Sequence, residues 1–209
     1  MRNDLIIANM ITFLIAGHDT TCGLLSFAFL NLMKSADAYN AAQREVDEVV
    51  SRGLIRVEHL NKLEYLNGVL TETLRLTPTT LAVTKQLVKG IGGKKTTLCR
   101  GKYQIESTDK ILVLLGAMQQ DPNVYGADAN EFKPERMMGD DFKNLPSPFG
   151  SGVRACIGRA FAWQEALMLT AMLLQNFDFR LHDPGYKLRI KQTLAIKPKD
   201  LIMRATLCH

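Results

Sequence analysis

The decapeptide FGSGVRACIG (residues 149–158) places one cysteine in a glycine-rich loop, with an arginine two positions before it. A pattern typical of a helix follows at once and continues to Gln175. Glycines let a backbone approach a flat ligand closely, while a nearby cation and free amides at a helix start favour the deprotonated thiol. The loop therefore predicts a thiolate that binds a metal. The alternative is an ordinary buried free cysteine.

The composition is that of a soluble globular domain. Of 209 residues, 46% are hydrophobic and 22% are charged, which allows one domain with a real core. The four cysteines lack paired spacing, so neither a disulfide framework nor a zinc site is indicated, and a reducing compartment fits best. The net charge is +5 without an aromatic-interleaved basic stripe, so we expect no nucleic-acid partner; a basic face would better suit an acidic protein.

The N-terminal segment predicts one long helix. Residues 4–34 contain no proline and are apolar almost all round, which indicates a helix that crosses the middle of a domain. The apolar run 5–17 is shorter than the roughly 20 residues that span a bilayer, so we interpret it as buried in a soluble protein. The start also lacks the features of a signal peptide. Together these observations favour a cytoplasmic location.

A polar group, AGHDTT (residues 16–21), interrupts this apolar helix. Burying polar groups costs roughly 1 to 3 kcal/mol each when they are unpaired, so their presence needs a reason. Thr20 can donate a hydrogen bond to the carbonyl of Ala16, four residues earlier. Asp19 and Thr20 place an acid beside an alcohol, a pair suited to proton transfer to a bound oxygen molecule. The alternative is a kinked helix whose polar groups are all satisfied.

Two further helices are expected before the chain changes character. The first is charged and covers residues 36–51, with Val46, Val49 and Val50 on its inner face. The second runs from Val57 or Leu63 to Leu76, because Pro78 disfavours helical backbone in the residue before it.

Short runs rich in β-compatible residues are expected to form a small sheet and then strands in the C-terminal tail. They cover residues 81–88, 103–106, 111–115, 177–179, 188–190 and 194–196. Residues 119–148 have no sustained period, and irregular segments of this length are often functional. A helix is expected over 157–175, after the cysteine loop.

Glu72 and Arg75 stand three residues apart on the helix that ends at Leu76 and therefore share one of its faces. Taken alone, such a pair is a surface ion pair worth a few tenths of a kcal/mol.

The cysteine loop resembles the haem-binding signature of the cytochromes P450, Phe-x-x-Gly-x-Arg-x-Cys-x-Gly, and every fixed position is present. Residues 16–21 are similar to the polar group in that family's central helix, and residues 72–78 resemble its Glu-x-x-Arg helix. The resemblance implies a mainly α fold with small β-sheets, comprising the long central helix, the Glu-x-x-Arg helix, the meander, the cysteine loop and the following helix. It covers nearly the whole chain, but only the C-terminal half of the family's haem domain.

The resemblance also implies haem b (iron protoporphyrin IX) as the cofactor. Cys156 would be its thiolate axial ligand, Arg154 would pair with a propionate, and Phe149 would pack over the sulfur. The residues expected to contact haem are Cys156, Arg154, Phe149, Gly150, Gly158, Ala16 and Ala162. The resemblance further implies that Thr20 would hydrogen-bond the bound dioxygen and that Asp19 would supply protons.

A structural network and a substrate pocket follow from the same resemblance. Arg136 would join Glu72 and Arg75 in a buried network. Three departures from the family pattern are visible: Met137 replaces an aromatic residue, and Gln119 and Gln120 replace the usual His-Arg. The segments expected to line the pocket contribute Thr80, Leu81, Ala82 and Leu194, although ordinary strand residues would give the same pattern.

The implied function is a haem-thiolate monooxygenase that inserts one atom of dioxygen into a C–H bond of a small apolar substrate, with a fatty acid as one candidate. Residues 176–198 look closest to the self-sufficient fatty-acid hydroxylases, in which a flavin reductase with FAD and FMN is fused to the haem domain and uses NADPH; a separate reductase is the alternative partner. The alternatives are a haem-binding or interaction fragment without turnover, and a peroxide isomerase or dehydratase, against which the Asp19–Thr20 pair argues.

The domain expectation is that residues 1–209 form a partial haem domain whose N-terminal half is absent. The first helix would then lack its covering partners, and the isolated chain would expose a large apolar patch. Attachment to the endoplasmic-reticulum membrane through a missing N-terminal anchor is the alternative to a cytoplasmic location.

Overall fold

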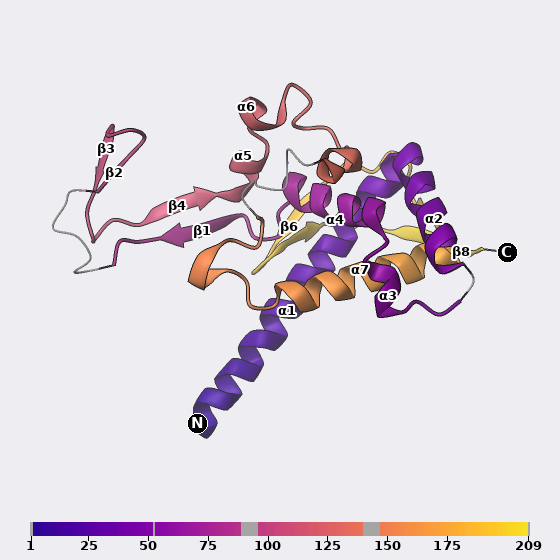
Figure 1. The fold of residues 1–209 in the computed structure, drawn as a ribbon, viewed down its shortest axis with the longest axis horizontal. Helices are drawn as coiled ribbons and strands as arrows, with labels where there is room; N and C mark the ends of the chain where they lie inside the picture. Colours follow the sequence, from indigo (N-terminus) through magenta and orange to yellow (C-terminus); the bar gives the residue numbers. More distant parts are fainter. Residues whose placement is uncertain (1, 52, 89–95, 140–146, 209) are drawn as a thin grey trace.

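The computed structural model describes residues 2–51, 53–88, 96–139 and 147–208, and its described part is mainly helical with small two-stranded β-ladders (Figure 1). The helices are α1 (Asn3–Lys34), α2 (Ala36–Val50), α3 (Val57–Leu60), α4 (Glu64–Leu76), α5 (Leu115–Gln119), α6 (Pro122–Tyr125) and α7 (Arg159–Asn176), with 3-10 turns η1 (Pro134–Met138) and η3 (Gly152–Arg154). The strands are β1 (Ala82–Lys85), β2 (Thr96–Leu98), β3 (Tyr103–Ile105), β4 (Ile111–Leu114), β5 (Phe177–Leu181), β6 (Ile190–Gln192), β7 (Ile196–Pro198) and β8 (Met203–Leu207).

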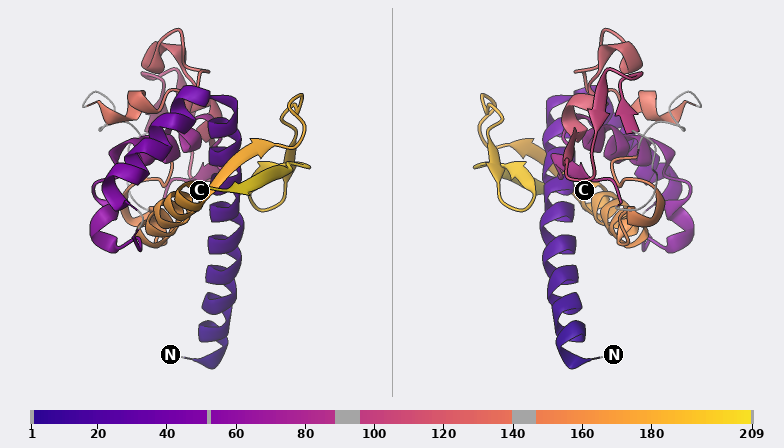
Figure 2. Two further views of the ribbon diagram at one scale, coloured as in Figure 1. Left: turned by 90° about the vertical axis from the view of Figure 1, so that its right-hand side faces the viewer. Right: turned by 90° about the vertical axis from the view of Figure 1, so that its left-hand side faces the viewer.

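Helix α1 is buried over its C-terminal half and exposed over its N-terminal half, which stands out from the body of the molecule (Figure 2). Phe27 and Leu32 are fully buried, whereas Leu14 is 72% exposed. The expected burial of residues 5–17 is therefore wrong, and the expected apolar patch is confirmed. An all-round apolar pattern indicates that a helix needs cover, but the described elements cover only its second half.

Length and composition alone would also let α1 cross a membrane, but the core helix of a soluble protein has the same properties. Its C-terminal half packs with α2, α4 and α7 in one hydrophobic core. Here α2 contributes a stripe of small side chains at four-residue spacing, Ala38, Ala42, Val46 and Val50. The expected inner positions of Val46 and Val50 are confirmed, and Val49 is half-buried at the edge of the core. Small side chains let helices approach closely, so this stripe sets the α2 packing distance.

The second expected helix is two helices, α3 and α4, and α4 begins where a side chain from α2 caps it. The Glu45 carboxylate accepts hydrogen bonds from the backbone N–H groups of Tyr65, at 2.6 Å, and Leu66, at 2.8 Å. Burial raises the pKa of Glu45 above its usual value, although the two amide bonds oppose that shift. This cap fixes the direction of α4, and with it the positions of Glu72 and Arg75.

The small sheet expected from residues 81–115 is two separate antiparallel ladders, β1–β4 and β2–β3. Strands β2 and β8 were not predicted. Every residue of both is exposed, so neither shows the alternation of buried and exposed side chains that marks a strand. The remaining ladders, β5–β8 and β6–β7, form the C-terminal tail.

The segment expected to be irregular, 119–148, contains α6 and η1 with turns around them, and its residues 140–146 lie outside the described part of the chain. The helix expected over 157–175 is α7, Arg159–Asn176.

The β6–β7 hairpin lies directly against α1. The backbone N–H of Ile196 donates to the carbonyl of Thr79 at 3.0 Å, which joins the hairpin to the segment before β1. A Cβ added to Gly23 would lie 2.6 Å from the carbonyl oxygen of Ile196 and 3.0 Å from Cγ2 of Thr79. Helix and hairpin can therefore meet at this distance only because residue 23 has no side chain.

Candidate active site

The cysteine loop is a tight turn that leads directly into α7. Gly150 and Gly152 have φ values of +74° and +69°, in the left-handed region that favours glycine. The backbone N–H of Cys156 donates to the carbonyl of Phe149 at 2.9 Å and closes the loop. At the start of α7, the N–H of Ala162 donates to the carbonyl of Gly158 at 2.9 Å. The loop therefore presents Cys156 just before the amino-terminal end of a long helix.

The side chain of Cys156 is exposed, so the alternative of a buried structural cysteine is wrong. No cluster of three or more His, Cys, Asp or Glu side chains that could hold a metal occurs among the described residues. A metal at this thiol must therefore bring most of its ligands with it, as iron in a macrocycle does. Val153 and Ile157 flank the cysteine and are almost fully exposed, which gives a flat apolar ligand a surface to contact. The donor set and its surroundings thus fit haem.

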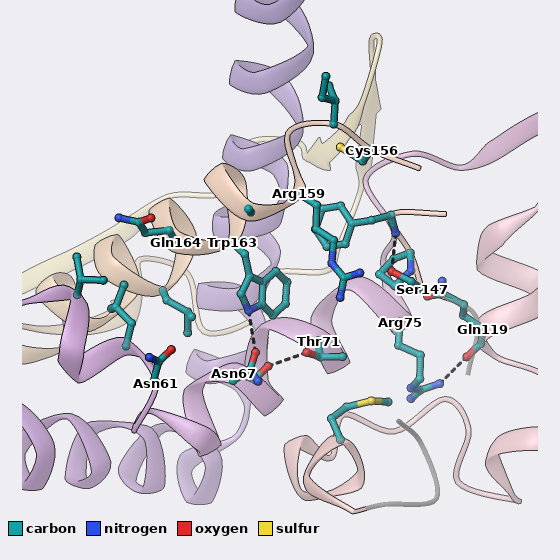
Figure 3. A pocket seen from close by; sticks show the side chains of 18 of the residues that line it. Asn61, Asn67, Thr71, Arg75, Gln119, Ser147, Cys156, Arg159, Trp163 and Gln164 are labelled. Atoms are coloured by element: carbon teal, nitrogen blue, oxygen red, sulfur yellow. Dashed lines mark hydrogen bonds between the residues drawn. The ribbon is translucent and has the colours of Figure 1, made fainter. Parts of the chain in front are cut away.

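Phe149, at the start of the loop, is held by aromatic and cationic neighbours from α7. Its ring meets that of Trp163 edge to face at 5.8 Å, and the guanidinium of Arg159 lies 5.8 Å from its centre. Trp163 in turn donates to the Oδ1 atom of Asn67 on α4 at 2.8 Å (Figure 3). The cysteine loop is thereby tied through α7 to the Glu-x-x-Arg helix. Arg154, expected at a propionate, lies exposed in η3.

A cavity of about 720 Å³ lies between the cysteine loop, α4 and α7 (Figure 3). Side chains from α4 and α7 line it together with Phe149 and Cys156, so Cys156 borders the cavity. Two polar side chains of its lining have hydrogen-bond partners, because the Thr71 hydroxyl donates to the backbone carbonyl of Asn67 at 2.8 Å while the Asn67 side-chain oxygen accepts from Trp163.

The polar group on α1 does not interrupt the helix, which continues unbroken through it. The Thr20 hydroxyl donates to the carbonyl of Ala16 at 2.7 Å, as its position predicts. A Cβ added to Gly17 would meet no atom within 4 Å, so this turn of the helix borders open space. Within the described residues no hydrogen bond joins Asp19 to Thr20.

Asp19 turns instead toward the C-terminal hairpin. Its carboxylate accepts a hydrogen bond from the Thr193 hydroxyl at 3.1 Å and lies 3.5 Å from the Lys197 ammonium. These contacts, the Thr193 hydrogen bond above all, hold the pKa of Asp19 below its usual value. Lys197 was not expected at the site, and Thr193 was expected only as part of the tail segment, with Leu194, that would line the substrate pocket.

The structure brings Glu72, Arg75 and Arg136 together in one buried network. Arg75 binds Glu72 through two parallel hydrogen bonds, Nε to Oε2 at 2.7 Å and Nη2 to Oε1 at 2.8 Å. Arg136 Nε reaches the same carboxylate at 3.4 Å, and the backbone N–H of Lys133 donates to it at 3.1 Å. Glu72 is fully buried and Arg75 is 2% exposed, so the alternative of a surface ion pair is wrong.

The two arginines also fasten the irregular segment to α4. Arg75 donates to the backbone carbonyls of Gln119, at 2.8 Å, and Ala129, at 2.6 Å. Arg136 donates to the carbonyl of Asp128 at 3.1 Å. Charged donors bind carbonyls more strongly than neutral ones, so the network compensates the missing regular structure in this segment.

The predicted pocket residues lie on two segments that the Thr79–Ile196 hydrogen bond holds side by side. Thr80 and Leu81 precede β1 and are exposed, and Ala82 is half-buried at its start. Leu194, in the turn between β6 and β7, is 66% exposed. Both segments therefore carry apolar side chains close to Gly23 of α1, which lies against Ile196 and Thr79.

The sequence profile of the cytochromes P450 matches residues 1–204. The chain belongs to the cytochrome P450 family. The chain is 55% identical over 205 residues to the bifunctional cytochrome P450/NADPH–P450 reductase ascE of Acremonium egyptiacum, covering 96% of this chain and 19% of that protein. It is 52% identical over 206 residues to the self-sufficient cytochrome P450 monooxygenase CYP505U2 of Exserohilum turcicum, covering 97% and 19%.

The fold agrees with the sequence. The crystal structure of the cytochrome P450 CYP102L1 matches with a TM-score of 0.90 and 34% identity, over 99% of this chain and 46% of that one. The predicted mainly α fold with small sheets is therefore confirmed. The P450 family uses haem, and the single-thiol donor set at Cys156 fits that cofactor. The chain spans about a fifth of the curated relatives it matches and about half of the solved structure.

Proposed function

We propose that the protein is a haem-thiolate monooxygenase that inserts one atom of dioxygen into a C–H bond of a small apolar substrate with an alkyl chain, such as a fatty acid. The observation that carries this proposal is the exposed Cys156 thiol on a loop in which every position of the P450 signature is filled. The intact acid–alcohol pair on α1 supports oxygen activation over a reaction that needs no proton supply.

Bound haem would supply the redox chemistry that splits dioxygen. Cys156 would hold it through the thiolate, and the amide groups at the start of α7 favour the charged form of that sulfur. Arg154 would neutralise a propionate, while Gly150, Gly158, Ala16 and Ala162 would leave room for the macrocycle. Asp19 would accept protons from solvent, and Thr20 would present its hydroxyl to the oxygen-binding side. Leu81, Ala82 and Leu194 would contact the alkyl chain.

The electron source that we propose is an NADPH-dependent reductase carrying FAD and FMN, fused to the haem domain. Two relatives, the Acremonium protein and one from Aspergillus oryzae, are named as bifunctional cytochrome P450/NADPH–P450 reductases. We further propose a cytoplasmic location, with attachment to the endoplasmic-reticulum membrane as the alternative.

A second candidate function is haem binding or partner interaction without turnover. The exposed apolar half of α1 favours it, because the described chain leaves uncovered a helix that the reaction requires in place.

Haem titration of the purified chain separates the two functions. We expect haem to be taken up and the reduced, carbon-monoxide-bound protein to show the Soret position of thiolate ligation. Cys156→Ser should lose that band, and Cys99→Ser, a matched change of another exposed thiol, should keep it. Reductase, NADPH and lauric acid are then added. Hydroxylated product supports the monooxygenase; a correct spectrum without product supports the binding function. Failure to bind haem would contradict the monooxygenase and the haem-binding function, and would leave partner interaction alone.

A further inference from the structure

The turn between β6 and β7 contacts α1 at the position of the acid. The Thr193 hydroxyl lies 3.1 Å from Oδ2 of Asp19 and 3.2 Å from the carbonyl oxygen of Ala195, and because both are acceptors its one proton is shared between the acid and the turn. The backbone N–H of Thr193 also donates to Ala195 at 2.9 Å. Ala195 and Ile196 are buried, at 3% and 4% exposed, which anchors the turn against the core.

The second contact is electrostatic and comes from the next strand. The Lys197 ammonium lies 3.5 Å from Oδ1 of Asp19, and both side chains are partly shielded, at 32% and 25% exposed. Among the described residues, the other titratable group facing this carboxylate is His18 on the same helix, whose Nδ1 also lies 3.5 Å from Oδ1. His18 is more exposed, at 69%, and its Nε2 faces the Cys22 sulfur at 3.8 Å.

The two contacts bind different oxygens of one carboxylate, Thr193 on Oδ2 and Lys197 on Oδ1. A carboxylate held at both oxygens has its rotamer fixed as well as its charge stabilised. The anchoring is rigid, because Gly23 lets Ile196 approach α1 one helical turn away from Asp19.

We propose that Thr193 and Lys197 are positioning residues for Asp19, and that the turn between β6 and β7 thereby sets the orientation of the acid. The role of Asp19 in this inference rests on the proposed function, but the positioning itself does not.

The test uses the chain without haem, so that its outcome is independent of cofactor binding. Aspartate labelled with carbon-13 at its side-chain carboxyl carbon is incorporated, and the Asp19 signal is assigned with Asp19→Asn. The chemical shift of this carboxyl carbon is then followed by NMR from pH 7 downward. In Thr193→Val and in Lys197→Met we expect the Asp19 titration to move up toward 3.8, its usual value, and the shift at pH 7 to change. Lys197→Arg keeps the positive charge and Thr193→Ser keeps the hydroxyl, so both variants should show the same Asp19 titration as the original chain.

The matched control is Lys191→Met, because Lys191 lies directly opposite Lys197 in the β6–β7 ladder and is exposed. It should leave the Asp19 signal unchanged, while amide spectra confirm that each variant keeps its fold. An Asp19 titration that is the same in Thr193→Val, Lys197→Met and the original chain would overturn the proposal. So would a shift of equal size in Lys191→Met, since that would indicate a general effect of hairpin charge.

Discussion

At the scale of single residues, Gln119 is a buried amide in an unfavourable position. Its side chain is 2% exposed, and neither Nε2 nor Oε1 has a hydrogen-bond partner among the described residues. The next residue behaves differently, because Gln120 Nε2 donates to the carbonyl of Leu76 at 2.8 Å. The two glutamines replace the His-Arg pair usual in the family, and only the second finds a partner. Buried polar atoms left without partners cost roughly 1 to 3 kcal/mol.

Replacing each glutamine by methionine should therefore have opposite effects. Gln119→Met keeps the volume and removes the unsatisfied amide, so we expect the free energy of unfolding to rise by about 1 kcal/mol. Gln120→Met removes a made hydrogen bond, so we expect it to fall by about 1 kcal/mol. Urea unfolding followed by circular dichroism measures both. A decrease in both variants would show that Gln119 has a stabilising partner.

Asp128 gives the chain a defined response to acid. Hydrogen bonds from Lys133 and then from Arg136 lower the pKa of its carboxyl from 3.8 to about 2. A lowered pKa means that the folded state holds the proton less tightly than the unfolded state. The stabilisation is therefore complete above pH 3.8 and is lost as the pH falls toward about 2.

The corresponding variant is Asp128→Asn, which should flatten the acid limb of the stability profile between those two pH values. Asp47→Asn on α2 is the control, since Asp47 is exposed and its side chain has no hydrogen bond or ion pair within the described residues. The free energy of unfolding is measured in urea from pH 2 to 5. An unchanged slope in Asp128→Asn would contradict the linkage.

At the scale of elements, the two glycines of α1 differ in what surrounds them. Gly23 faces the backbone of Ile196, where a Cβ would come within 2.6 Å, whereas a Cβ on Gly17 would meet nothing within 4 Å. Gly23 is thus required by the contact between helix and hairpin. Gly17 only weakens the helix, because glycine is about 1 kcal/mol less favourable than alanine in a helix interior.

Alanine substitutions at these sites should change stability in opposite directions. Gly23→Ala forces the hairpin away from α1 and should lower the free energy of unfolding by roughly 1 to 3 kcal/mol. Gly17→Ala should raise it by up to about 1 kcal/mol. Thermal and urea unfolding measure both effects. Equal stabilisation by the two alanines would be evidence that the hairpin does not contact α1 so closely.

Long helices were the part of this fold that sequence patterns predicted well. The expected bounds of α1, α2 and α7 differ from the observed ones by one or two residues, because each helix is a long stretch without proline and α2 also has apolar residues at helical spacing. Strands β2 and β8 could not be found, since an exposed two-stranded ladder carries no burial pattern.

In the site too, contacts within one helix could be predicted from the sequence, whereas contacts between distant segments could not. Glu72 and Arg75 lie on one helix, so their spacing predicted the contact, although their burial depends on α2, α7 and the irregular segment. Thr193 lies 174 residues from Asp19, and nothing in the local sequence of either residue indicates that they meet. Such contacts follow only from how the hairpin packs on the helix.

At the scale of the whole molecule, the exposed half of α1 forms an apolar surface on the described chain. Leu14 is 72% exposed, and Met10 and Ile7 are 66% and 57% exposed. Contiguous apolar surfaces of this kind favour association in water. We expect the isolated chain to self-associate at micromolar concentration.

The substitution Leu14→Lys should weaken this association severalfold without lowering the free energy of unfolding, because the side chain makes few contacts. Leu54→Lys, at a site that is 85% exposed and outside α1, should not change it. Sedimentation velocity over a concentration series measures the effect. A chain that is monomeric at all concentrations would contradict this expectation. So would an equal change of self-association in Leu14→Lys and Leu54→Lys.

A helix that is packed at one end and bare at the other also has two rates of opening. Amide hydrogens in its last turns, around Phe27 and Leu30, can exchange with solvent only when the core opens. Those in its first turns are held by helical hydrogen bonds alone, and short helical stretches without packing are marginally stable in water. Deuterium should therefore enter α1 as a gradient, and the point where exchange slows marks where the core begins to hold the helix.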